Sequence, residues 1–438
     1  MERYSAYKDS GVDWIGEIPE GWKTIKNKHL AYIRARLGWK GLKAEEYVDD
    51  GYPMYSAFNC VEGNLCPTPV NYISRERYDE SPEIMLSDGD ILLVKDGAGI
   101  GKYAVIRKVE KPATVNGSLA VISPTPNMES RYLGYFYASM QFQDYIHLLM
   151  DGMGVPHLFQ RDLKQVPVIV PPKAEQQSIA DYLDEKTGVI DAAVKDIERS
   201  IELLNEYRQS VISEAVTKGL DPTVPMKDSG IDWIGQIPEH WSVLYPKKLF
   251  ALRKERAHAD DQQLTASQKY GVISQKRFMA LENQRVMAVL TGNDILKHVE
   301  AGDFVISMRS FQGGLEYSYE SGKISSAYVM VHPFTEQTYS EYYKYLFKTW
   351  AYIQALQSTS NLVRDGQALR YANFAQVYLP VPSIEEQQMI AHYLDDATEN
   401  INSLIQQKQS LVVRLKEYRA SLISECVTGK VKVPGVEE

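Results

Sequence analysis

The chain has 438 residues, of which 44% are hydrophobic and 24% are charged; these proportions are typical of a soluble globular protein and too apolar for a disordered one. Its longest apolar runs are far too short to cross a bilayer, and the N-terminal residues MERYSAYKDSG have no apolar core that would mark a secretory signal. Three cysteines are too few for a disulfide framework. We therefore expect a cytoplasmic protein built from about two to four structural units.

Charge is unevenly distributed along the chain. The net charge of −9 argues by itself against a nucleic-acid partner. However, residues 23–170 carry 17 basic and 17 acidic side chains, and residues 242–381 carry 16 and 12. Most of the acidity therefore lies outside these two segments, and we expect any DNA binding within them to use local basic clefts.

Two motifs occur twice, in the same order. The segment KDSGVDWIGEIPEGW (8–22) returns as KDSGIDWIGQIPEHW (227–241), and EQQSIADYLD from Glu175 returns as EQQMIAHYLD from Glu386. The order is a short motif, a variable segment and a long repeat, followed by all three again. Such self-similarity indicates a duplicated architecture.

Each variable segment has the pattern of a mixed α/β domain. A glycine that signals a turn precedes a first strand, a second strand follows, and a tyrosine-rich helical stretch then leads to a glycine-containing loop. The expected strands are 90–95, 118–123, 303–308 and 327–331, the expected helical stretches are 131–149 and 339–357, and the loops are 151–165 and 361–376.

Each long repeat is predicted to be a helix. From Glu175 to Ala215 there is no proline, and apolar residues recur in alternating steps of four and three, which is the period of a coiled-coil seam. At ~1.5 Å per residue, some 40 residues would form a rod of roughly 60 Å. We expect the two helices to pack antiparallel on each other; the alternative is two ordinary amphipathic helices in separate cores. The predicted seam residues are Ile190, Val194, Ile197, Ile201, Leu204, Val211 and Ala215 in the first copy, and Ile401, Ile405, Val412, Leu415, Leu422 and Cys426 in the second.

This order of features resembles the specificity subunits of type I restriction-modification systems over essentially the whole chain. The resemblance is carried by W-I-G-x-I-P-x-x-W, a G-D-[IF] strand, a P-x-P exit and E-x-Q-Q at the helix start. We therefore expect an α+β fold, in which two mixed α/β target-recognition domains are joined by two long antiparallel coiled-coil helices with pseudo-two-fold symmetry. The predicted parts are 1–170 (short motif and first target-recognition domain), 171–219 (first spacer helix), 220–381 (repeated motif and second target-recognition domain) and 382–438 (second spacer helix and C-terminal tail).

The resemblance also implies a function and partners. Each target-recognition domain would read half of a bipartite site in double-stranded DNA, and the helices would act as a spacer and as the dock for two adenine methyltransferase subunits. Motor-nuclease subunits would then join that core. S-adenosylmethionine is expected on the partner methyltransferase and not on this chain.

The sequence lacks the motifs of enzymes that act on DNA. No Pro-Pro pair is followed by an aromatic residue, as the base-holding loop of an adenine methyltransferase would require. Segment 96–102, DGAGIGK, superficially matches a phosphate-binding loop, but Asp96 and Tyr103 stand where such a loop needs Gly and Ser or Thr, so we interpret it as a turn between two strands. The eight histidines are scattered and no His/Cys group has zinc-site spacing. We therefore expect a non-catalytic chain without metal or cofactor; the alternatives are a fused methyltransferase or nuclease, and a coiled-coil scaffold without DNA specificity.

Candidate DNA contacts come from loops and strand ends in both variable segments. Arg and Lys read guanine edges, Asn and Gln read adenine edges, and Ser is adaptable; loops on a rigid scaffold are where such side chains usually lie. The candidates of the first segment are Lys95, Asp96, Lys102, Asn116, His157, Gln160 and Arg161, with Asn59 nearby in the pattern. Those of the second are Gln275, Lys276, Arg277, Arg309, Ser310, Gln312, Arg364 and Arg370, with Gln367 in the same loop.

Four tryptophans in the short motifs admit two interpretations. Trp14, Trp22, Trp233 and Trp241 could stack on single-stranded bases. Their place in a repeated motif next to the long helices favours a packing role instead.

Overall fold

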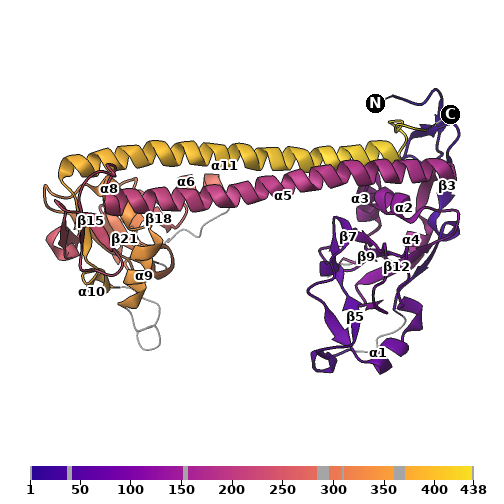
Figure 1. Ribbon diagram of the computed structural model, residues 1–438, viewed down its shortest axis with the longest axis horizontal. Coiled ribbons are helices and arrows are strands. Elements are labelled where there is room, and N and C mark those ends of the chain that lie inside the picture. The colour runs from indigo at the N-terminus through magenta and orange to yellow at the C-terminus, as the bar shows by residue number, and fades with distance from the viewer. Residues whose placement is uncertain are drawn as a thin grey trace. The chain divides into compact units, whose positions relative to one another are not determined.

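The computed structural model describes residues 2–36, 42–150, 156–283, 295–307, 310–359 and 370–436. Its chain divides into two compact units, Met1–Glu198 with Ser410–Glu438, and Arg199–Gln409. Each unit contains one mixed α/β domain and parts of two long helices, α5 (Lys173–Lys218) and α11 (Ile384–Val427) (Figure 1). The expected fold class, two mixed domains joined by two long helices, is confirmed. No helix in the described part of the chain combines the length and the apolar character that a bilayer crossing requires.

The first domain contains a six-stranded sheet and a three-stranded sheet. In spatial order the larger sheet has β4 (Ala31–Arg34), β12 (Leu119–Pro124), β9 (Ile91–Val94), β10 (Tyr103–Val105), β7 (Gly63–Leu65) and β6 (Cys60–Val61); the smaller has β11 (Thr114–Val115), β5 (Tyr52–Tyr55) and β8 (Asn71–Ile73). All pairs are antiparallel except β7 with β10 and β5 with β11. Every residue of the central strand β9 is buried, as its unbroken apolar sequence predicts. The turn expected at 96–102 is confirmed, because β9 and β10 form an antiparallel pair on either side of it.

The first domain has four α-helices among the residues that the structure describes. They are α1 (Arg75–Asp79), α2 (Ser130–Ala138), α3 (Met140–Leu149) and α4 (Gln160–Gln165). Of these, α2 packs on the strands β10 and β12, and α1 lies by β5 (Figure 1). The single helical stretch expected at 131–149 is in fact two helices. Ser139 has extended backbone, and its hydroxyl accepts a hydrogen bond from the N–H of Phe142, so it ends α2 and caps α3.

The second domain has a smaller central sheet and two further two-stranded pairs. The sheet has the order β17 (Phe250–Arg253), β24 (Val329–Pro333), β21 (Phe304–Ile306) and β22 (Glu316–Tyr317), and the pairs are β18 (Leu264–Ser267) with β19 (Gly271–Ser274) and β20 (Lys297–Val299) with β23 (Gly322–Ile324). Its helices are α6 (Gln275–Glu282), α7 (Ser310–Gly313), α8 (Ser340–Leu346), α9 (Trp350–Ser358) and α10 (Tyr371–Phe374). As in the first domain, a hydroxyl divides the expected helical stretch, because Thr349 caps α9 by accepting from the N–H of Tyr352.

The short motifs and the chain segments that flank each domain form two-stranded ribbons. These are β1 (Tyr7–Asp9) with β2 (Glu17–Pro19), β3 (Lys23–Lys26) with β13 (Pro167–Val170), β14 (Met226–Asp228) with β15 (Gln236–Pro238), and β16 (Ser242–Leu244) with β25 (Leu379–Val381). All four ribbons are antiparallel. Pairs β3–β13 and β16–β25 each join the strand that precedes a domain to the strand that follows it. The chain therefore enters and leaves each domain at the same place.

The tryptophans of the short motifs pack against other parts of the protein, which is the role that their place in a repeated motif favours. Trp22 and Trp241 are buried, and their indole N–H groups donate to Glu175 and Glu386 at 3.0 and 3.1 Å. Trp14 stacks on Tyr145 with ring centroids 4.5 Å apart. In both copies the glutamate directly before Gln-Gln at the helix start therefore accepts the indole proton, which joins the short motif to the long helix.

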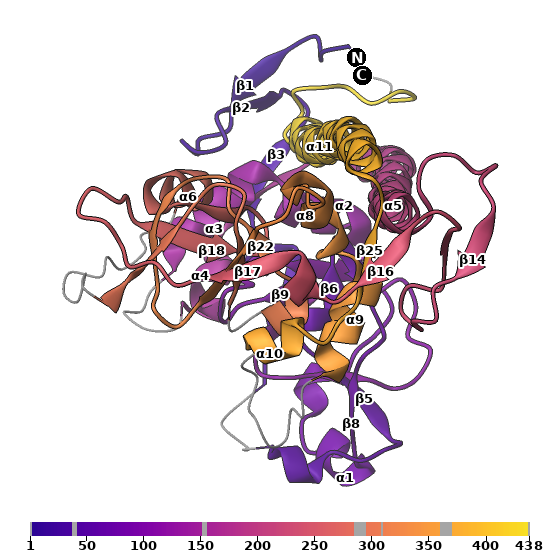
Figure 2. The ribbon, with the colours of Figure 1, turned by 90° about the vertical axis from the view of Figure 1, so that its left-hand side faces the viewer.

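The two long helices run antiparallel within each unit. In the first unit Asp191 of α5 lies opposite Arg419 of α11 at 2.8 Å, and Glu198 lies opposite Lys416 at 3.0 Å. In the second unit Arg208 of α5 contacts Asn402 of α11. Figure 2 shows the two helices side by side in end-on view. Predicted seam residues of both helices, among them Ile190, Val194, Val412, Leu422 and Cys426, belong to one apolar cluster in the first unit, which argues against separate cores.

A buried glutamine at the start of each long helix joins the helix to its domain. In the second unit, Gln387 Oε1 accepts from the N–H of Tyr339 at 2.9 Å, and its Nε2 donates to the carbonyl groups of Gln337 and Pro382 at 2.8 and 3.1 Å. Gln176 makes the corresponding contacts in the first unit with the N–H of Glu129 and the carbonyl of Pro171, both at 2.9 Å. A side chain with two donors and an acceptor is suited to this place because it satisfies backbone groups on both sides of the junction.

We predict that Gln387→Ala destabilises the second unit, because it leaves the buried carbonyl of Pro382 and the half-buried N–H of Tyr339 without this partner. Such orphaned groups cost ~1–3 kcal/mol, which corresponds to several degrees in a domain of this size. Differential scanning calorimetry of the full chain measures the shift. The matched control is Gln388→Ala at the exposed neighbouring position, and equal transitions for the two variants would contradict the prediction.

Candidate nucleic-acid interface

Three segments that are distant in sequence meet at the end of β9 in the first domain. The N–H of Lys95 donates to the carbonyl of Ser118 at 2.9 Å, and the N–H of Leu158 donates to the carbonyl of Lys95 at 2.9 Å. The turn after β9, the turn before β12 and the segment from residue 156 onward therefore form one continuous surface. Each segment carries residues that the sequence marks as candidate DNA contacts, and the structure brings them together.

Asp96 is the centre of this surface. Its carboxylate lies 2.7 Å from Lys95 Nζ through one oxygen and contacts His157 Nδ1 through the other. The same two residues, Asp96 and His157, also form a backbone bridge. Lys95 is thus already paired with a carboxylate, so it reaches a phosphate or a guanine edge only if this ion pair opens.

The remaining candidates of the first domain differ in the exposure of their side chains and in the hydrogen bonds that these side chains already make. Lys102 is exposed on the β9–β10 turn. Asn116 is half-buried, and its Oδ1 accepts from the N–H and the hydroxyl of Ser118 at 3.1 and 2.6 Å, which holds the local turn. Asn59 is buried and donates to the carbonyls of Cys66 and Pro69. Its amide therefore stabilises a loop, and the suggestion that it lies among the DNA contacts is not supported.

Gln160 and Arg161 begin α4, directly after His157 in the chain. Gln160 is half-buried and Arg161 is exposed, and the Arg161 guanidinium lies 4.7 Å from the ring centroid of Phe159. Stacking on an aromatic ring fixes the plane of a guanidinium while leaving its N–H donors available. The Nε of Arg161 lies 3.5 Å from the Asp162 carboxylate, so the terminal N–H groups of its guanidinium are the ones placed to donate outward.

In the second domain the expected strand end at Gln275, Lys276 and Arg277 is the first turn of a helix. Strand β19 ends at Ser274 and α6 begins at Gln275. Lys276 and Arg277 are exposed, and Arg277 has a single ion pair, at 3.4 Å, with Glu320. A long pair of this kind at a solvated site stabilises little, so the guanidinium is readily released to another partner.

The other candidates of the second domain divide into three groups. Ser310 is fully buried and its hydroxyl accepts from the N–H of Ser307 at 2.8 Å, so in this conformation it does not reach solvent. Gln312 and Arg370 are exposed. Arg309 and Arg364, together with Gln367, lie outside the described residues.

Sequence reasoning missed a cleft of about 650 Å³ between the second domain and the helices of the same unit. Its lining includes five basic side chains, Arg208, Lys269, Arg277, Lys344 and Lys348. Several of these are paired, Lys344 with Asp395 at 2.7 Å and Lys348 with Glu316 at 2.7 Å. The basic residues come from three distant segments, and no periodic pattern in the sequence connects them.

Comparisons with known proteins agree on one family. The family model described as the type I restriction modification DNA specificity domain matches residues 19–203 and 238–413. A putative type I restriction enzyme MjaX specificity subunit from Methanocaldococcus jannaschii is 23% identical over 429 residues, covering 96% of each chain. The MjaVIII specificity subunit from the same organism is 22% identical over 431 residues, covering 95% of this chain and 94% of the relative.

Solved structures share the fold. A chain from a structure describing complex assembly and conformational transition of the type I R-M system has a TM-score of 0.66 at 13% identity, covering 94% of this chain and 99% of its own length. The HsdS subunit from Thermoanaerobacter tengcongensis has a TM-score of 0.50 at 14% identity, with 94% and 98% covered.

We predict that Arg277→Ala weakens specific DNA binding by ~1–3 kcal/mol if the side chain reads a base, and that the recognised sequence relaxes at one position. If Arg277 contacts only phosphate, binding falls alike on all sequences and depends less steeply on salt. Fluorescence anisotropy with specific and random duplexes at several salt concentrations distinguishes these outcomes. The control is Arg199→Ala on α5, which is 60% exposed against 62% for Arg277 and likewise has a carboxylate partner. If both variants bind like the unaltered chain, Arg277 lies outside the interface.

Proposed function

Because the chain belongs to the type I restriction-modification DNA specificity family, we propose that it reads a bipartite DNA site, one half with each unit, and docks adenine methyltransferase subunits along its long helices. Its membership rests on a family model that matches most of the chain in two copies. The chain is accordingly a DNA-recognition subunit and not an enzyme.

One observation supports bipartite reading. The contacts that attach a domain to its long helix, which we call the frame, occur in both units, whereas the candidate DNA-contact surfaces of the two units differ. Both units have the same ribbon, helix-start and tryptophan contacts. Their candidate surfaces differ: the first centres on the Asp96 carboxylate with Lys95 and His157, whereas the second presents Lys276 and Arg277 at the start of α6. Two frames that hold chemically different surfaces suit two different half-sites, since carboxylates accept from cytosine and guanidinium groups donate to guanine.

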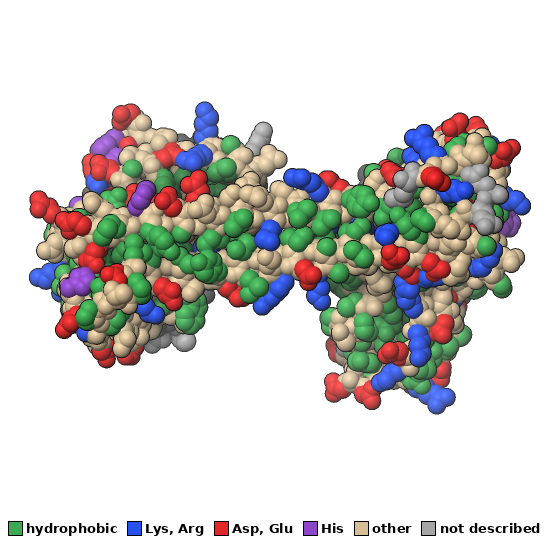
Figure 3. Space-filling model, turned by 45° about the horizontal axis from the view of Figure 1, so that its top comes forward, with side chains coloured by type: hydrophobic (Ala, Val, Ile, Leu, Met, Phe, Trp, Pro, Cys, Tyr) green, Lys and Arg blue, Asp and Glu red, His purple; other side chains and the backbone are tan. Residues whose placement is uncertain are grey.

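Exposed apolar side chains on the helix pairs support the docking proposal. Tyr207 of the second unit and Tyr418 of the first occupy the same position in the repeated EYR motif, and they are 59% and 54% exposed. Exposed Leu203 and Leu404 lie on the long helices of the second unit, and exposed Val413 lies on α11 in the first. Figure 3 shows hydrophobic side chains gathered over the long helices. Contiguous exposed apolar surface marks sites of protein association.

A hollow beside Tyr207 gives this surface a shape that a partner can fill. A cleft of about 800 Å³ in the second unit is lined by Tyr207 and Val211 of α5, Tyr393 of α11, and Leu220 and Met226 of the segment that follows α5. Its lining also includes the charged residues Glu214, Lys218 and Asp221, so the cleft suits a methyltransferase segment that offers both apolar and polar side chains. Motor-nuclease subunits would join through that core, S-adenosylmethionine would be held by the methyltransferase, and the complex would act in the cytoplasm.

The test is co-expression with an adenine methyltransferase subunit of a type I system from the same genome, followed by affinity purification and by mapping of methylated adenines in the host genome. The unaltered chain should copurify with the methyltransferase and direct methylation to two short sequences separated by a fixed gap. The double variant Tyr207→Glu with Tyr418→Glu should lose copurification at least tenfold, because it places a charge in each apolar contact.

The control is Glu206→Gln with Glu417→Gln, which alters the preceding residue of the same motif without adding charge to the apolar surface. Specific duplex binding by the isolated double tyrosine variant should remain, which separates docking from reading. Methylation at one uninterrupted sequence would contradict bipartite reading, and full copurification of the glutamate variant would contradict docking on this surface.

A further inference from the structure

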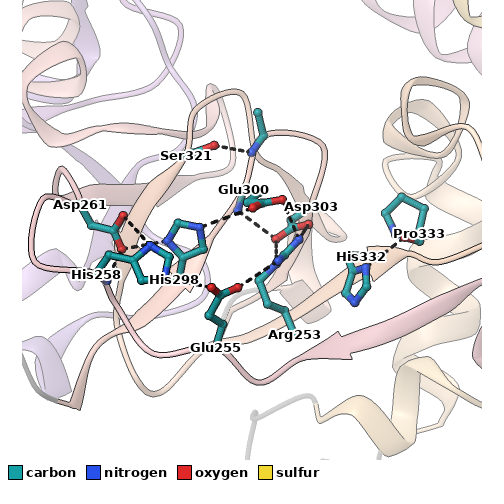
Figure 4. A network of polar contacts seen from close by, with 11 residues as sticks. Arg253, Glu255, His258, Asp261, His298, Glu300, Asp303, Ser321, His332 and Pro333 are labelled. Carbon is teal, nitrogen blue, oxygen red and sulfur yellow. Dashed lines mark hydrogen bonds and ion pairs between the residues drawn. The ribbon is translucent and has the colours of Figure 1, made fainter.

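Two histidines that are far apart in the sequence lie against each other in the second domain. The rings of His258, in the segment after β17, and His298, in β20, have centroids 4.3 Å apart. His298 is buried, whereas His258 is exposed. One ligand atom each from Glu255, His258 and His298 lie within 4.8 Å of one another. Figure 4 shows the two rings with carboxylates on both sides of them.

Asp261 occupies the Nδ1 side of the two histidine rings and leaves their Nε2 atoms for other partners. Its carboxylate lies 2.8 Å from Nδ1 of His298 and 3.8 Å from Nδ1 of His258, and it also accepts from the backbone N–H of His258 at 2.7 Å. A carboxylate that accepts from Nδ1 of His298 favours the tautomer whose lone pair is on Nε2, as in carboxylate–histidine–metal arrangements.

Two glutamates lie on the Nε2 side. Glu255 Oε1 is 2.9 Å from Nε2 of His258, and Glu300 Oε1 is 3.8 Å from Nε2 of His298. The other oxygen of each glutamate is held by Arg253, at 3.3 and 3.1 Å. Arg253 therefore orients both carboxylates and leaves one oxygen of each toward the histidines.

Charge at this place favours a cation. Glu255, Asp261, Glu300 and Asp303 contribute four carboxylates, and Arg253 contributes the one guanidinium that contacts three of them. With neutral imidazoles the group has an excess of negative charge. A divalent cation would reduce that excess and would replace the His258–Glu255 contact by two coordinate bonds.

We propose that Glu255, His258 and His298 bind a zinc ion, with Glu300 or water in the fourth position. Two imidazoles and a carboxylate are an established donor set for Zn²⁺, whose bonds of ~2.0–2.2 Å place tetrahedral ligand atoms ~3.4 Å apart. The present separations close to that value by rotation of the exposed His258 and of the Glu255 side chain, while His298 stays fixed by Asp261. Mg²⁺ and Ca²⁺ prefer oxygen ligands, so imidazole favours zinc over them.

Such an ion would hold the base of the hairpin that leads into α6, the helix on which the candidate DNA contacts Lys276 and Arg277 lie. The segment that contains Glu255, His258 and Asp261 leads into β18, the β18–β19 hairpin follows, and α6 with Lys276 and Arg277 comes next. His298 lies in β20, which pairs with β23. The zinc would thus tie the entering segment to the β20–β23 pair and would limit movement of the hairpin. Zinc binding does not depend on the proposed function, and it is measured without DNA.

The experiment is equilibrium dialysis of the full chain against Zn²⁺ with metal analysis, in a Cys66→Ser background so that this partly exposed thiol makes no contribution. The unaltered background should bind one Zn²⁺ per chain, and excess Mg²⁺ should not displace it. His258→Ala and His298→Ala should each weaken binding at least tenfold, and Asp261→Asn should weaken it ~10–100-fold by releasing the orientation of His298.

The matched control is His240→Ala. His240 is 52% exposed and lies 2.8 Å from the Glu386 carboxylate, whereas His258 is 50% exposed and lies 2.9 Å from Glu255. His240 has no second histidine beside it among the described residues, so its loss should leave zinc binding unchanged. Equal zinc affinity of His258→Ala and the background, or a loss in His240→Ala of the same size, would overturn the proposal; circular dichroism checks that each variant is folded.

Discussion

A buried polar junction at the start of each long helix fixes how a recognition domain is attached. One glutamine spans from the helix start to the backbone that precedes α2 or α8, and the neighbouring glutamate accepts an indole proton from the short motif. Buried polar groups of this kind contribute little net stability when they are satisfied, but they are costly when they are not. The junction therefore specifies one orientation of the domain on its helix more than it adds to the free energy of folding, and the candidate DNA contacts depend on that orientation.

The long helices and the central strands are predicted well from the sequence, because the spacing of apolar residues determines both. The 3.5-residue spacing of Ile190, Val194 and Val412 predicts burial between paired helices, and these residues are buried. The glycine before each domain strand and the apolar run of β9 likewise predict a central strand. The helix breaks at Ser139 and Thr349 follow from the same rules, since hydroxyl residues prefer the N-cap position. The sequence analysis instead expects one continuous helix in each domain, because each of these stretches is rich in tyrosine.

The chemistry of the surfaces is less accessible to sequence reasoning. Nothing in the spacing of Lys95, Asp96 and His157 predicts that one carboxylate joins the other two side chains, because long-range contacts decide it. Ser310 resembles an adaptable reader in sequence, yet its hydroxyl serves the backbone of Ser307. The pairing of His258 with His298 has the same origin, since strand β20 returns to the segment after β17 only in the folded domain.

The two units share the contacts that attach each domain to its helix, whereas their candidate surfaces differ. Each domain is therefore positioned by contacts that do not involve its candidate DNA contacts. The measurement that tests this most directly is an exchange of residues 23–170 for the equivalent segment of another family member, with methylated adenines then mapped in cells that supply the methyltransferase. The account predicts that one half of the methylated sequence changes while the other half stays as it was. A sequence altered in both halves, from a complex that still assembles, would contradict it.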